Sequence, residues 1–204
     1  MSASVPLVFH ASLPPEEAAR ADLYALLARL FYAAPDAAVL AALAASAPPD
    51  ETTALGQAWL GLKGAAAEAT PEDVRAEYEE TFIGTGRARI SLYGTHYLSE
   101  TWRELTLADL RARLAGLGLA RNPGAAEPED HLAGLCDVMQ MLVRRGANGE
   151  DIAAQKAFFS TYLAPWYARL CQEIQACDLV FYRSAANFLQ AYCDLEQQGF
   201  SIED

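Results

Sequence analysis

The chain is expected to fold as an all-α protein, a single-domain helical bundle. Alanine is abundant while valine and isoleucine are sparse, a bias that favours helix over strand. Apolar residues recur at helical spacing in several segments, and an alternation of period two is nowhere sustained. At 204 residues the chain is long enough for one core, which we place in residues 13–204, after a flexible lead-in over residues 1–12.

Helix starts in the first half are marked by prolines and by short polar side chains that can cap a helix. Thr70-Pro71-Glu72-Asp73 is a capping box with proline at the first helical position, and Val74, Tyr78 and Phe82 follow it at four-residue steps. Thr106 with Asp109 predicts a later start. The helices expected here cover residues 14–34, 36–46, 55–62, 70–82 and 106–116.

The most informative stretch is Glu127-Pro128-Glu129-Asp130-His131, called the box below. Pro128 suits the first position of a helix that runs to about Arg145, and Glu129 and Asp130 would then face the positive end of the helix dipole. The same dipole disfavours a cation, so the imidazole of His131 is expected to stay neutral. The plain alternative is a well-capped helix with a histidine at its rim.

The remaining segments are read from turn residues and aromatic patterns. Residues 83–92, 121–126 and 146–149 are expected to be loops, because glycine, proline and asparagine are concentrated there. Two aromatic-rich helices should follow, separated by Pro165, and a last helix should cover residues 178–197.

Composition excludes several classes of function. A net charge of −12 without a basic patch argues against nucleic-acid binding and favours a cationic peptide partner. The sequence shows neither a secretion signal nor an apolar run long enough to span a membrane, and its four cysteines form no C-x-x-C pair. We therefore expect a cytoplasmic protein with reduced thiols. The three histidines are scattered, so no metal site or cofactor is predicted.

The order of several motifs resembles the TorD/DmsD/NarJ family of cytoplasmic chaperones for redox enzymes exported by the twin-arginine system. The resemblance runs from about Arg20 to about Leu195, and the box is its most specific element. The motifs, in chain order, are Glu77-Tyr78 with Phe82 and Gly84, Tyr93-Gly94-Thr95-His96-Tyr97, the box, and Phe158-Phe159 with Leu163, Pro165 and Trp166.

The resemblance implies a set of signal-peptide-binding residues in the aromatic segment and the box. Tyr and Trp offer large apolar surfaces with one polar end, which suits a groove wall, although aromatics at this spacing more often belong to a core. Tyr78 and Phe82 are secondary groove candidates. The site residues expected are Tyr93, Tyr97, Trp102, Glu127, Pro128, Asp130 and His131.

The function implied is that of a dedicated chaperone, not an enzyme. It would bind the twin-arginine signal peptide and the apo-form of a redox enzyme, of the molybdenum-cofactor class, and delay export until cofactor insertion is complete. Rival interpretations are a hydrolase or nucleotide-using enzyme built around Asp130 and His131, and a plain helical scaffold. Guanine nucleotide binding is implied by the resemblance alone. We also expect a monomer–dimer mixture, with a homodimer formed by helix exchange at the 121–126 connection.

Overall fold

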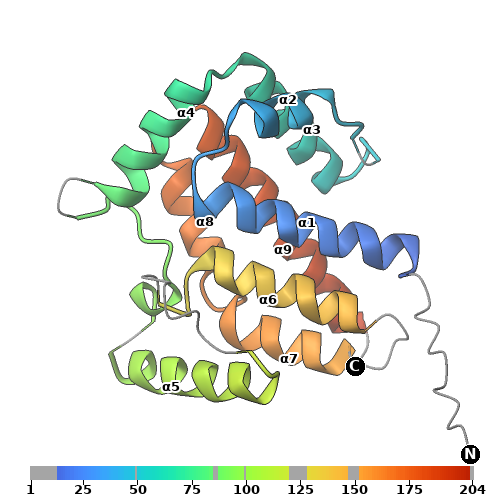
Figure 1. Ribbon diagram of the computed structural model, residues 1–204, viewed down its shortest axis with the longest axis vertical. Helices are drawn as coiled ribbons and strands as arrows, with labels where there is room; N and C mark the ends of the chain where they lie inside the picture. Colours follow the sequence, from blue (N-terminus) through green and yellow to red (C-terminus); the bar gives the residue numbers. More distant parts are fainter. Residues whose placement is uncertain are drawn as a thin grey trace, which may run out of the picture.

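The computed structural model describes residues 13–48, 50–84, 87–98, 100–119, 128–146 and 152–202, with the side chains of residues 100–106 left aside. These residues form nine α-helices and no strand (Figure 1). The all-α fold that the sequence predicts is therefore confirmed. The helices are α1 (Pro15–Tyr32), α2 (Ala37–Ala45), α3 (Ala54–Glu68), α4 (Pro71–Tyr78), α5 (Glu100–Gly116), α6 (Leu132–Arg145), α7 (Ile152–Tyr162), α8 (Tyr167–Gln175) and α9 (Phe181–Ile202).

The starts of α2 and α4 lie where the sequence predicts them, and Thr53 caps α3 in the same way. The side chains of Asp36, Thr53 and Thr70 accept hydrogen bonds from backbone N–H groups three residues later, at 3.0 to 3.2 Å. Each bond satisfies one of the N–H groups that the first helical turn leaves without a partner. These local signals therefore set the starts of α2, α3 and α4.

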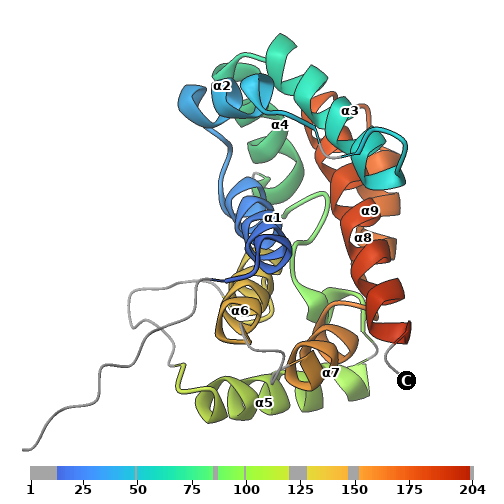
Figure 2. The ribbon, with the colours of Figure 1, turned by 90° about the vertical axis from the view of Figure 1, so that its right-hand side faces the viewer.

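Helices distant in sequence close the core. α1 packs along α6, while α9 packs against α3, α4 and α8. Figure 2 shows α1 and α6 on one side and the long α9 on the other. The centre holds fully buried aromatic side chains, among them Tyr24, Phe31 and Tyr182.

Two expected helix starts are wrong. α5 begins at Glu100 rather than Thr106, and α6 begins at Leu132 rather than Pro128. In addition, α4 does not continue as an α-helix through Phe82, because residues Glu79–Ile83 form a π-helical turn. The expected loops at 121–126 and 147–149 and the lead-in over residues 1–12 lie outside the described residues.

A half-buried carboxylate, that of Glu77, joins α4 to α9. Both oxygens of Glu77 accept from the start of α9: Val180 N–H at 2.8 Å, Phe181 N–H at 3.3 Å and Tyr182 N–H at 3.0 Å. A carboxylate at a helix N-terminus satisfies unpartnered donors and meets the positive end of the dipole. Glu77 therefore serves as a cap supplied by another helix.

Candidate functional site

The structure brings the aromatic segment and the box together. Gly94 N–H donates to the carbonyl of Asp130 at 3.0 Å, and Leu132 N–H donates to the carbonyl of Leu92 at 2.8 Å. Tyr93 and His131 thereby form an isolated antiparallel bridge, with ring centroids 5.0 Å apart and edge to face. We call this contact the junction. It joins two segments that sequence analysis related only through a family resemblance.

The box lies before α6 rather than in its first turn. Pro128 is exposed, Glu129 and Asp130 form a turn, and His131 is the N-cap. Its Nδ1 accepts a hydrogen bond from Ala133 N–H at 3.2 Å. The expectation that Pro128 opens the helix is therefore wrong, because the backbone at His131 is extended to form the junction.

His131 is held neutral by burial. The pKa of its imidazole lies below the ordinary value of 6.5, because burial penalises the cation. The negative charge of Asp130 acts in the opposite direction, but its effect is smaller. Accepting from Ala133 N–H also requires an unprotonated Nδ1, which places the proton of the neutral ring on Nε2. The sequence predicted a neutral imidazole for a different reason, the helix dipole.

Asp130 is the box residue with an unsatisfied polar atom. Its side chain is buried, with 4% of the residue exposed, and its Oδ2 accepts from Thr95 N–H at 2.8 Å. Within the described part of the chain, Oδ1 has no hydrogen-bond partner. Buried polar atoms without partners are rare and costly, so this oxygen marks a place where a donor fits.

Glu129 ties the box to α5. Its two carboxylate oxygens accept from Nε and Nη2 of Arg111 at 3.2 and 3.1 Å. This fork-to-fork geometry fixes orientation as well as distance. Glu129 therefore contributes to the placement of the box and is not an uninvolved neighbour of Asp130.

Tyr97 belongs to an aromatic stack with Trp166. Only a short 3-10 turn, Gly94–His96, separates it from Tyr93. The ring of Tyr97 stacks on Trp166 at 5.5 Å between centroids, and the guanidinium of Arg169 lies 5.4 Å from its centroid on the ring face. Burial, and then the nearby carboxylate of Glu173, raise the pKa of the Tyr97 phenol.

The stack explains why a glycine follows Tyr93. A Cβ on Gly94 would lie 2.9 Å from Nε1 of Trp166, a distance that side-chain carbons do not adopt. Trp166 cannot move away easily, because it is buried and its Nε1–H donates to the carbonyl of Tyr162 at 2.6 Å. Close approach of the backbone to the indole therefore requires glycine here.

The remaining expected site residues lie elsewhere or outside the described part. Glu127 is not among the described residues, and Trp102 lies on α5 where side chains are not described. Phe82 is a core residue that packs edge to face on Tyr182 at 5.0 Å. Tyr78 is also buried, and its hydroxyl donates to the carbonyl of Tyr32 at 2.8 Å. The roles of Trp102 and Glu127 stay predictions.

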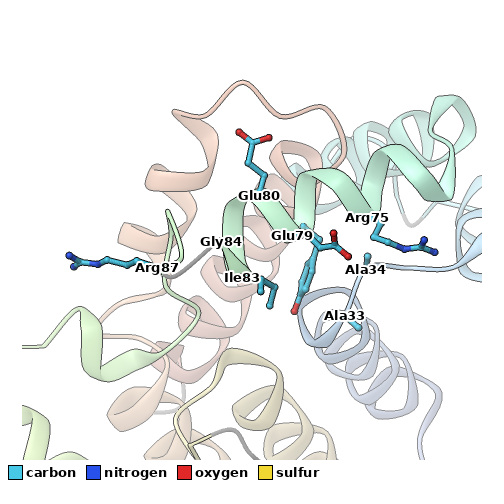
Figure 3. A pocket seen from close by; sticks show the side chains of 9 residues that line it. Ala33, Ala34, Arg75, Glu79, Glu80, Ile83, Gly84 and Arg87 are labelled. Carbon is cyan, nitrogen blue, oxygen red and sulfur yellow. The ribbon is translucent and has the colours of Figure 1, made fainter.

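A cavity of about 820 Å³ opens between the end of α1 and the π-helical turn. Figure 3 shows the side chain of Glu79 pointing toward Ala34, while Arg87 points away. Ile83 is 59% exposed, although it is a large apolar residue. The lining residues are Ala33, Ala34, Arg75, Tyr78, Glu79, Glu80, Ile83, Gly84 and Arg87.

Among the residues that line this cavity, only Tyr78 was expected at a binding site. The extra residue of a π-helical turn rotates the side chains that follow it, and such turns are frequent at functional sites. Gly84 ends the turn with φ of +66°, and a Cβ there would lie 2.2 Å from the carbonyl oxygen of Arg87. The glycine was the only visible signal, and it indicated a break in the helix without indicating which side chains would be left exposed.

The described side chains do not form a catalytic arrangement around Asp130 and His131. Asp130 Oδ2 accepts from Thr95 and His131 Nδ1 accepts from Ala133, so the carboxylate does not orient the imidazole as it would in a hydrolase triad. The thiols of Cys136 and Cys171 have pKa values raised by burial, which disfavours thiolate chemistry. No group of three or more potential metal ligands occurs among the described residues.

Comparison with known families decides the classification. Residues 48–172, more than half of the chain, match the family model described as nitrate reductase delta subunit. The chain belongs to this family. The matched region of this nitrate reductase delta family member includes the π-helical turn, the junction and the box. The family, of the NarJ/TorD type, comprises chaperones for the maturation of redox enzymes.

Other comparisons add less. No curated protein sequence matches the chain. None of the helices in the described ranges combines the length and apolar character needed to cross a membrane.

Proposed function

We propose that the chain is a chaperone that binds the twin-arginine signal peptide of a redox enzyme of the molybdenum-cofactor class. Holding that peptide delays export until the cofactor has been inserted and the enzyme has folded. Family membership supports the maturation role. The observation that carries the peptide assignment is the buried carboxylate oxygen of Asp130, which has no partner within the described residues.

An arginine side chain fits this oxygen chemically. A guanidinium donates several N–H bonds in a planar fork, and its bonds to a carboxylate are among the stronger ones in proteins. The net charge of −12 adds a long-range attraction that raises the rate of encounter with a basic peptide. One of the two arginines therefore binds at Asp130, and His131, kept neutral, adds no opposing charge.

The apolar stretch of the signal peptide packs in the cavity beside α1. Ile83, Ala33 and Ala34 supply apolar surface there, and Glu79 provides a carboxylate for a flanking basic residue. Tyr78 also lines this cavity, and its hydroxyl donates a hydrogen bond to the backbone of α1. Of the two secondary groove candidates, Tyr78 thus contributes to the cavity and Phe82 to the core.

Binding has to be reversible, since the precursor is passed on to the export machinery. A dissociation constant of micromolar order, about −8 kcal/mol, meets that need.

Calorimetric titration with synthetic peptides tests the proposal. A peptide with the twin-arginine motif and its apolar stretch should bind with micromolar affinity. The same peptide with two lysines should bind about tenfold more weakly, because an ammonium cannot form the planar fork. Equal binding of the two peptides, or no binding of either, would contradict the proposal. Turnover of a nucleotide or ester by the purified protein would favour the enzyme alternative instead.

A further inference from the structure

A second cavity, of about 480 Å³, lies between the first turns of α1 and the last turns of α9. These two helix ends lie on the same side of the molecule in Figure 1, near the start of α7. We call it the α1–α9 cavity. Its lining residues are Glu17, Ala19, Arg20, Leu23, Leu55, Ile152, Tyr192, Leu195, Glu196, Gly199 and Phe200.

The charged groups of this cavity are already satisfied by one another. Arg20 donates from Nε and Nη2 to Glu196 at 2.8 and 2.7 Å, from Nη1 to Glu17 at 2.9 Å, and from Nη2 to Gln155 at 3.2 Å. Glu196 also accepts from the hydroxyl of Tyr24 at 3.0 Å. A polar or charged ligand would have to break this network, so the cavity favours an apolar occupant.

Apolar side chains supply the surface that stays available. Leu195 is 49% exposed on α9, and Leu23 and Leu55 contribute from α1 and α3. Gly199, one turn after Leu195, carries no side chain, and a Cβ there would meet nothing within 4 Å. An extended apolar segment can therefore approach α9 closely at this point.

The chain itself contains such a segment a few residues before α1 in the sequence. Val5-Pro6-Leu7-Val8-Phe9 is an uncharged apolar run in the twelve residues before Leu13. Leu13 is partly buried against the core, and Glu17, one turn into α1, already lines the cavity. The chain that precedes Leu13 is thus tethered at the edge of the cavity.

The tether is long enough for the run to cover the cavity. Val8 is five residues before Leu13, and an extended chain advances about 3.3 Å per residue, so Val8 can lie up to roughly 17 Å from Leu13. The α1 wall from Glu17 to Leu23 is only about 9 Å long at about 1.5 Å per residue. A tethered segment also binds at a high effective concentration, which a free peptide would lack.

We propose that residues Val5–Phe9 dock in the α1–α9 cavity of the same chain. The docked run covers Leu195 and the neighbouring apolar wall, and so removes an apolar surface that would otherwise attract other chains. This inference does not depend on the signal-peptide site proposed at the junction and the π-helical turn.

Disulfide trapping in the full-length protein tests the docking. The four native cysteines are buried, so an introduced pair reacts without competition from them. Val8→Cys with Leu195→Cys should form an intramolecular disulfide on mild oxidation, seen at monomer size on a non-reducing gel. The control pair is Val8→Cys with Val180→Cys. Val180 is also exposed, but it lies about 22 Å from Leu195 along the axis of α9, at about 1.5 Å per residue. This pair should cross-link severalfold less.

Two further variants show whether apolar packing drives the trapping. Both are made in the protein that carries Val8→Cys and Leu195→Cys. Leu7→Asp with Phe9→Asp should reduce the yield of that disulfide severalfold. Ser2→Asp with Ser4→Asp adds the same charge and should leave the yield unchanged. Disulfide-linked dimers would mean that a second copy fills the cavity, and equal yields in the two cysteine pairs would mean that the run does not dock. Either result overturns the proposal.

Discussion

Replacing Asp130 with asparagine separates a peptide-binding role from a structural one. Asparagine has nearly the same shape, and its carbonyl oxygen can still accept from Thr95 N–H, which lies 2.8 Å from Oδ2 in the native protein. The amide group takes the place of Oδ1, which has no partner among the described residues, so one unsatisfied atom replaces another. The free energy of unfolding should therefore change by less than about 1 kcal/mol.

Peptide binding should respond much more strongly. A hydrogen bond to a charged group contributes about 1.5–3 kcal/mol, so losing the carboxylate should weaken binding of a twin-arginine peptide by about 10- to 150-fold. Calorimetry gives the affinity, and thermal melts give the stability of the same samples. Asp130→Ala removes the acceptor for Thr95 as well, so it should lose peptide affinity by about 1–3 kcal/mol and also melt at a lower temperature.

The control has to change the same charge without changing the junction. Glu129 does not serve, because it pairs with Arg111 and so helps to hold the box in place. Asp137 is exposed on α6, and no hydrogen bond is observed for it among the described residues. Asp137→Asn should leave both affinity and stability nearly unchanged. If Asp130→Asn binds the peptide as Asp137→Asn does, Asp130 is a structural residue and the site assignment is wrong.

Three further predictions concern stability, two at the junction and one at the start of α9. Because the pKa of His131 is lowered in the folded protein, the unfolded state binds more protons at acidic pH, and the protein should lose stability as pH falls below about 6.5. His131→Asn keeps a capping side chain and should flatten this pH dependence in thermal melts. Gly94→Ala should cost about 1–3 kcal/mol in chemical denaturation because its Cβ meets Trp166, whereas Gly64→Ala in the open interior of α3 should stabilise by about 0.5–1 kcal/mol. Glu77→Ala should cost about 0.5–2 kcal/mol by uncapping α9, and an unchanged melting temperature would refute that role.

Local signals in the sequence were sufficient for most of the fold. Capping side chains at Asp36 and Thr70 and the interruption at Pro165 lie at or beside the observed helix ends. The start of α6 could not be found this way, because the extended backbone at His131 is fixed by pairing with Leu92 and Tyr93. Long-range backbone pairing overrides the local preference that a proline creates.

The sequence related Tyr93 to His131, but it did not predict the geometry that joins them. The motif order placed Tyr93 and His131 in one functional group, and the structure brings them into contact. It gave no indication that Asp130 would be buried or that Ile83 would be exposed, since burial depends on which helices pack together. The helix-exchanged dimer depends on residues 121–126, which lie outside the described residues, and it stays a prediction.

The burial of Asp130 has a consequence for affinity. With 4% of the residue exposed, an arginine can reach Oδ1 only after the surrounding chain has opened locally. The apparent dissociation constant then equals the intrinsic one divided by the fraction of molecules that are open. A change that eases opening without touching Asp130 should therefore tighten binding while it lowers stability.

Glu129→Gln provides that change. It removes the charge that pairs with Arg111 at 3.1 Å and loosens the attachment of α5 to the box, yet it leaves the bond from Thr95 to Asp130 in place. The twin-arginine peptide should bind up to a few-fold more tightly to this variant, and the melting temperature should fall slightly. High salt screens the exposed pair in the native protein, so the difference between the two proteins should shrink as salt is added. Weaker binding by Glu129→Gln at low salt would show that Glu129 contacts the peptide directly, and the opening step would then have to be abandoned.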